Sequence, residues 1–192
     1  MKIRNGFVSN SSSSSFVVVF PQIPISDIDV MQMMFGNPPK IRGVQGYGDE
    51  GSSIYDVAGL VFDDISVQKD NDIDKICGEM RQFSHKYSCG TEKGLFDEFE
   101  SPENWHEYDA EIKRQGLNWQ REEDRKKINA LGDKFDRKSE RSARKMAKKL
   151  MDKHKTEFIF VFEYGDHNGT LEMNCEQGNI FRFLPHIKIN KH

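Results

Sequence analysis

The sequence predicts an α/β domain, with α+β as the alternative, in which helices cover a small mixed sheet of about four strands. Three observations predict this class. Short apolar runs typical of buried strands stand near both ends of the chain, and amphipathic helical segments lie between them. The length of 192 residues with 36% hydrophobic content suits one domain, residues 1–192, and residues 84–155 form a mostly helical insertion within it.

The first predicted strand is the apolar run FVVVF, residues 16–20, which is followed by Pro21 and reads as buried on both faces. Ser26 is a suitable N-cap for the first helix, whose apolar residues recur at helical spacing, and Gly36 suits the end of that helix. A strand followed directly by a capped helix is therefore expected in the first forty residues.

A second strand is expected over residues 40–44 and a second helix over residues 52–65. The alternation of strands and helices suggests a βαβ unit with parallel strands. GYGDEG, residues 46–51, formally matches the G-x-G-x-x-G pattern of dinucleotide sites, but its two acidic residues would repel a pyrophosphate, so no nucleotide is assigned. Asn71 is expected to cap a third helix over residues 72–83.

Residues 84–120 show only scattered aromatic residues and are read as loops and short helices. From Arg121 the pattern is strongly helical, and residues 139–155 have one apolar face surrounded by Lys and Arg. Two further strands are expected at residues 157–164 and 186–190, with turns and a short helix between them. We expect both strands to share one sheet with the N-terminal strand.

The net charge of −3 gives no global reason to expect a nucleic-acid or membrane partner, but it hides a local excess. Residues 121–155 contain fourteen basic and seven acidic residues. The three cysteines follow no metal-ligand spacing and favour a reducing compartment, and no apolar run reaches the roughly 20 residues that span a bilayer. A soluble intracellular protein with no membrane partner is expected.

A run of serines that enters the first strand is the first candidate site. Its hydroxyl and amide groups either bind an anion such as phosphate, or bond to nearby backbone in a purely structural role, or form a tag that another protein recognises. No Lys or Arg lies within the run, which weakens the anion reading. The candidate ligand-binding residues are Ser9, Asn10, Ser11, Ser12, Ser13, Ser14 and Ser15.

Carboxylate and imidazole groups near the C-terminus are the second candidate. Asp166, Glu176 and His186 are weak candidates for acid–base catalysis. Together with His167 and Glu172 they would offer ligands to a divalent ion, but their spacing follows no metal-binding pattern and a capped turn explains them as well. No metal or other cofactor is assigned.

The basic helix over residues 134–153 is the third candidate. Lys and Arg side chains on an amphipathic helix neutralise nucleic-acid phosphates, although such a charge run is more often only a solvated face. Aromatic residues for base stacking are not interleaved with these cations, so any contact would be independent of base sequence. The residues with the strongest claim are Arg141, Arg144, Lys145 and Lys148.

The opening MKIRNGFVSNSSSSSFVV resembles that of an uncharacterised group of bacteriophage and bacterial proteins that share an SNSSSSSF signature. The closing 35 residues resemble the tail of the same group, which ends in an HIRI-like strand. Where that group has Glu-His-Gly, this chain has Glu176-Gln177-Gly178, and glutamine is no general base. The resemblance implies a phage accessory protein that acts in the cytoplasm of a host bacterium.

Three function classes follow. The leading one is a binding module, more an interaction protein than an enzyme, that acts on a host or phage macromolecule during infection, with a protein as the expected partner. The alternatives are an enzyme acting on a phosphate-containing small molecule and a nucleic-acid binder that uses the basic helix. The oligomeric state is not indicated.

Overall fold

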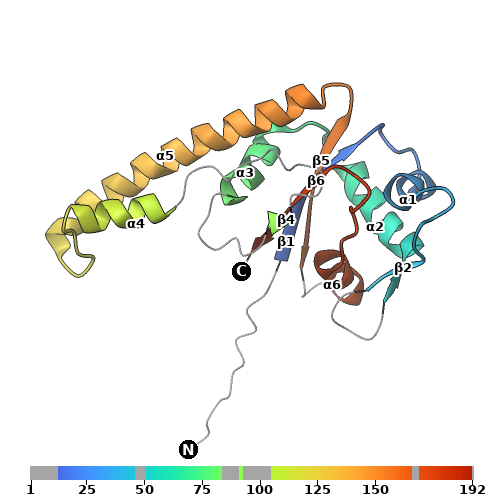
Figure 1. Cartoon of the computed structure of the whole chain (residues 1–192), viewed down its shortest axis with the longest axis horizontal. Coiled ribbons are helices and arrows are strands. Elements are labelled where there is room, and N and C mark those ends of the chain that lie inside the picture. The colour runs from blue at the N-terminus through green and yellow to red at the C-terminus, as the bar shows by residue number, and fades with distance from the viewer. Residues whose placement is uncertain (1–12, 46–50, 84–90, 93–104, 166–168, 192) are drawn as a thin grey trace, which may run out of the picture.

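The computed structural model describes residues 13–45, 51–83, 91–92, 105–165 and 169–191. Its centre is a four-stranded antiparallel sheet in which the first strand of the chain lies between two strands from the C-terminal region (Figure 1). The strands of this sheet, in spatial order, are β4 (Thr91–Glu92), β6 (His186–Lys191), β1 (Ser13–Phe20) and β5 (Phe158–Gly165). The prediction that both ends of the chain share one sheet is confirmed.

The six described helices complete an α+β fold, which confirms the predicted class. They are α1 (Asp27–Phe35), α2 (Ile54–Val67), α3 (Ile73–Phe83), α4 (Trp105–Arg114), α5 (Glu122–Lys153) and α6 (Thr170–Gln177). Helices α1, α2 and α6 cover one face of the sheet, and α3 with the C-terminal part of α5 covers the other (Figure 1). Because successive strand side chains point to opposite faces, β1 is apolar throughout and feeds both cores.

The predicted parallel βαβ unit is wrong. Residues 43–44 form β2 (Gly43–Val44), which pairs antiparallel with β3 (Ser52–Ser53) in a separate two-stranded ribbon. No place beside β1 is free for this segment, because β5 and β6 occupy both neighbouring positions. Since β2 and β3 form a hairpin in front of α2, the setting that a dinucleotide-binding loop requires is not present. Residues 46–50 of the glycine motif lie outside the described residues.

The helix caps agree with the predictions at both ends of α1 and differ at the start of α3. The Ser26 hydroxyl accepts the Asp29 N–H at 3.2 Å, and Gly36 ends α1 at a φ of 89°. At α3 the cap is Asp72, whose carboxylate accepts two backbone N–H groups of the first turn, and not Asn71 as expected. Asn71 has a φ of 51°, and its side chain bonds to Ile159 of β5 and not to the first turn of α3.

Side chains close the outer edge of β5. Asn71 donates its N–H to the Ile159 carbonyl at 2.9 Å, and its side-chain oxygen accepts the Ile159 N–H at 3.1 Å. Gln68 accepts the Val161 N–H at 3.2 Å, and Lys75 donates to the Val161 carbonyl at 3.3 Å. These groups satisfy backbone that an edge strand otherwise exposes, so this edge is protected against pairing with another chain.

The C-terminal part of α5 packs on the sheet, whereas its N-terminal part pairs with α4. Ala143, Ala147 and Leu150 are buried beside the sheet. Tyr108, Ile112 and Ile128 form a separate small core between α4 and α5. We call α4, residues 115–121 and the first half of α5 the arm; α5 has 32 residues and is about 48 Å long. Figure 1 shows the arm extending away from the sheet.

Candidate functional site

The serine run continues into β1. The strand begins at Ser13, three residues before its predicted start, since Ser13 pairs with Gly165 of β5 and Lys191 of β6. Ser14 and Ser15 are 3% and 0% exposed, and the Ser15 hydroxyl has no hydrogen-bond partner. Burial in a strand that is paired on both sides keeps the Ser14 and Ser15 side chains from a ligand, but the Ser15 hydroxyl does not make the bond to nearby backbone that the structural interpretation expected. Residues 9–12 of the candidate ligand site lie outside the described residues.

The two candidate catalytic residues that the structure describes, Glu176 and His186, are buried. Glu176 lies in α6 and is 5% exposed. His186 begins β6, is 1% exposed, and donates from Nδ1 to the Leu184 carbonyl at 2.9 Å. Asp166 and His167 lie outside the described residues. Within the part of the chain that the structure describes, no three His, Cys, Asp or Glu side chains converge on a point suitable for a metal ion.

A hydrogen bond between half-buried Asp64 and buried Tyr164, which the sequence did not indicate, joins α2 to the end of β5. The Tyr164 hydroxyl donates to Asp64 Oδ2 at 2.9 Å. Burial raises the pKa of Asp64 above its ordinary value of 3.8, and burial with the nearby Asp64 charge raises the pKa of Tyr164 well above 10.0. Burial also raises the pKa of Cys175 to about 12, so this thiol stays protonated and is a poor nucleophile.

The raised pKa of Asp64 predicts a pH effect on stability. Above pH 3.8 the unfolded chain loses the proton of Asp64 while the folded chain still holds it, so stability falls as pH rises toward the folded-state pKa. We expect Asp64→Asn to remove this fall, which amounts to at most about 1.4 kcal/mol per pH unit. Urea unfolding of the wild-type and Asp64→Asn proteins at several pH values between about 3.5 and 6, a range chosen around the ordinary pKa of aspartate, measures this fall. The prediction is contradicted if the free energies of unfolding of the two proteins change with pH in parallel.

Exposed cations form one continuous row on α5. Steps of four and three residues alternate along this row, so its members stay on one side of the helix. The opposite side carries Ala143, Ala147 and Leu150, which are buried against the rest of the protein. The row therefore faces away from the core. We call it the basic stripe, and it consists of Lys134, Lys138, Arg141, Lys145 and Lys148.

Acidic residues of the same helix lie on another side. Asp136 pairs with Arg81 of α3 at 3.0 Å, and Asp133 and Glu140 stand one turn before and after it. Arg144 also faces α3, where it pairs with Asp74 at 3.3 Å. Asp133, Asp136 and Glu140 thus lie on a different side of α5 from the stripe, whereas Asp152 stands one turn beyond Lys148 on the stripe side. Five cations against this one carboxylate leave the stripe with an excess of positive charge.

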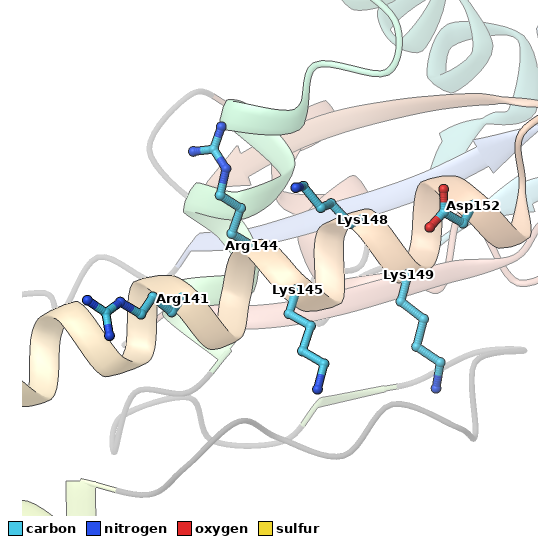
Figure 2. Close-up of a pocket in the computed structure, with 6 residues that line it drawn as sticks. All are labelled: Arg141, Arg144, Lys145, Lys148, Lys149 and Asp152. Atoms are coloured by element: carbon cyan, nitrogen blue, oxygen red, sulfur yellow. The ribbon is translucent and has the colours of Figure 1, made fainter.

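The C-terminal half of the stripe borders a surface hollow of about 550 Å³ (Figure 2). Figure 2 shows Lys145 and Lys149 pointing to the same side of the helix. Within the described residues, no acidic side chain forms an ion pair with Arg141, Lys145 or Lys148, whereas Lys138 pairs with Glu107 at 3.3 Å. The hollow is lined by Arg141, Arg144, Lys145, Lys148, Lys149 and Asp152.

All four nucleic-acid candidates from the sequence border this hollow. Arg141, Lys145 and Lys148 belong to the stripe, while Arg144 is held by Asp74 of α3. Within the described chain, no helix is both long enough and apolar enough to cross a membrane. Comparison of the chain with protein-family models, curated proteins and solved structures gave no match.

Proposed function

We propose that this chain is a binding protein that holds nucleic acid by its phosphate groups, with the basic stripe as the contact surface. One observation carries the proposal. Arg141, Lys145 and Lys148 are exposed on successive turns of α5, and no acidic side chain of the described chain forms an ion pair with them. Such cations attract a polyanion because each phosphate contact releases condensed counterions.

The dimensions of the stripe suit a phosphate backbone. From Lys134 to Lys148 the stripe extends about 21 Å along the helix. A nucleic-acid strand in a duplex places one phosphate about every 3.4 Å along its axis, so the stripe faces about six phosphates. No aromatic residue interrupts the stripe, which supports contact with the backbone and not with particular bases.

The remaining candidate residues support binding over catalysis. Glu176 and His186 are buried, and the thiol of Cys175 is protonated at neutral pH. An enzyme acting on a phosphate-containing small molecule would need such groups to meet the substrate. From the resemblance of the two termini to phage proteins we also infer a host or phage nucleic acid in the bacterial cytoplasm as the ligand. A host or phage protein as an additional partner stays a prediction.

The test measures binding to a labelled duplex of arbitrary sequence by fluorescence anisotropy. Salt is varied between about 50 and 200 mM, because counterion release changes the affinity measurably over this range. For about four phosphate contacts we expect the logarithm of the association constant to fall with the logarithm of salt concentration with a slope of about −4. Replacing Arg141, Lys145 and Lys148 by glutamine should bring this slope close to −1.

A matched control keeps the net charge change the same. Arg42, Lys69 and Lys155 are exposed and lie outside α5, and replacing all three by glutamine also removes one Arg and two Lys. This control variant should keep the salt slope of the wild-type protein. Equal loss of affinity in both triple variants would mean that only net charge matters and would overturn the proposed surface.

A further inference from the structure

Trp119 is an exposed aromatic residue at the end of the arm. It lies in the turn between α4 and α5, and 52% of its surface is exposed. The small core of the arm does not include it. The indole ring is therefore accessible to a ligand at the end of the arm.

The turn that carries Trp119 is held in place by hydrogen bonds. The Asn118 N–H donates to Asp124 Oδ2 at 3.1 Å, and the Gln120 N–H donates to the Asn118 side chain at 2.9 Å. Arg125 donates from Nε to the Trp119 carbonyl at 3.1 Å. Asp124 is itself only 7% exposed. A fixed backbone presents the indole with little entropy left to lose on binding.

The charges around the turn favour a base over a phosphate as the ligand group. Arg121 and Lys126 line a shallow hollow there together with Glu122 and Glu123. Two carboxylates beside two cations give no net attraction for a phosphate. The flat face of a neutral base stacks well on indole, and an adjacent Arg adds a cation–π contribution.

We propose that Trp119 stacks on an unpaired base of the same nucleic acid whose phosphates lie on the basic stripe. This inference rests on the proposed function. Nineteen residues separate the start of α5 at Glu122 from Arg141, a distance of about 29 Å along the helix. At about 3.4 Å per nucleotide pair, the stacked base lies eight or nine positions beyond the contact at Arg141. The ligand class is a duplex that continues into a single-stranded overhang.

The experiment compares two labelled ligands of equal length. The first is a duplex with a single-stranded overhang. The second is a duplex closed at both ends by hairpin loops, so that it has no free single-stranded end. Trp119→Ala should bind the overhang ligand about 5- to 100-fold more weakly than the wild-type protein and the closed ligand equally well. The overhang ligand should quench the tryptophan fluorescence of the wild-type protein, and Trp119→Phe should lose that part of the quenching.

Tyr55→Ala is the control, because Tyr55 is also an exposed aromatic residue, 62% exposed, but lies at the start of α2. It should change neither affinity nor quenching. If the stripe variant weakens binding while Trp119→Ala binds both ligands as the wild type does, the stacking inference is overturned and the proposed function stands. If the wild-type protein binds neither ligand, both are overturned. Capture of a protein through Trp119 without nucleic acid would also overturn the inference.

Discussion

Replacing Phe181 by alanine is expected to lower the free energy of unfolding by about 3–5 kcal/mol, the largest effect of the substitutions considered for this protein. Phe181 is fully buried, and its ring centroid lies 5.3 Å from that of Phe16 and 5.1 Å from that of Phe162. It therefore joins the segment between α6 and β6 to both β1 and β5. Removing the ring leaves a cavity that three separate chain segments cannot close together.

Urea unfolding measures this change, and Phe183→Ala is the matched control. Phe183 is only half-buried, with Lys40 Nζ 4.6 Å from its ring centroid, so its loss should cost about 1 kcal/mol or less. The two positions are two residues apart, and both variants remove the same atoms. A similar loss of stability in both would show that the sheet does not depend on the packing of Phe181.

The strands and helices of the sheet layer could be predicted because their signals are local. The apolar run of residues 16–20, the N-cap Ser26 and the helical spacing in α2 each depend on neighbouring residues, and all three predictions are confirmed. Burial of β1 on both faces follows from the same run, because a strand with apolar residues at every position needs a core on each side.

The exclusion of β2 from the main sheet could not be predicted, because strand pairing depends on segments far apart in the chain. Pairing of β1 with β5 and β6 excludes β2 from the sheet, and nothing near residues 40–44 indicates this. Asn71 illustrates the same limit: its side chain bonds to β5 some 88 residues away, although the local sequence suits a helix cap. Phe181 lies outside regular secondary structure, so no periodicity marks it as the centre of a core.

The candidate site shows the same division. The stripe follows from helical periodicity alone, since its members recur in steps of four and three residues. Periodicity does not show which cations are already paired, because Arg144 pairs with Asp74 on a different helix. The small, buried side chains of Ala143 and Ala147 let α5 pack closely against α3, and this packing fixes the rotation of α5. Packing of the core thereby decides which side of α5 meets a ligand.

Gly178→Ala is expected to destabilise the protein by about 3 kcal/mol, the upper end of the cost of overpacking. Gly178 follows α6, and its backbone lies against β2. An added Cβ would overlap the side chain of Val44 and lie 2.6 Å from the Asn174 carbonyl oxygen, which as backbone cannot move aside cheaply. Because φ is −73° there, alanine is compatible with the backbone conformation, and crowding alone carries the effect.

Gly78→Ala separates crowding from the general effect of adding a methyl group. Gly78 is exposed within α3, and a Cβ built there meets no atom within 4 Å. Alanine should therefore stabilise α3 by about 0.5–1 kcal/mol, since glycine loses more backbone entropy in a helix. Urea unfolding should therefore show a lower free energy of unfolding for Gly178→Ala and a higher one for Gly78→Ala. This difference in sign would show that the packing of Gly178 against Val44 leaves no room for a methyl group. Stabilisation by Gly178→Ala would contradict the close packing of Gly178 against Val44.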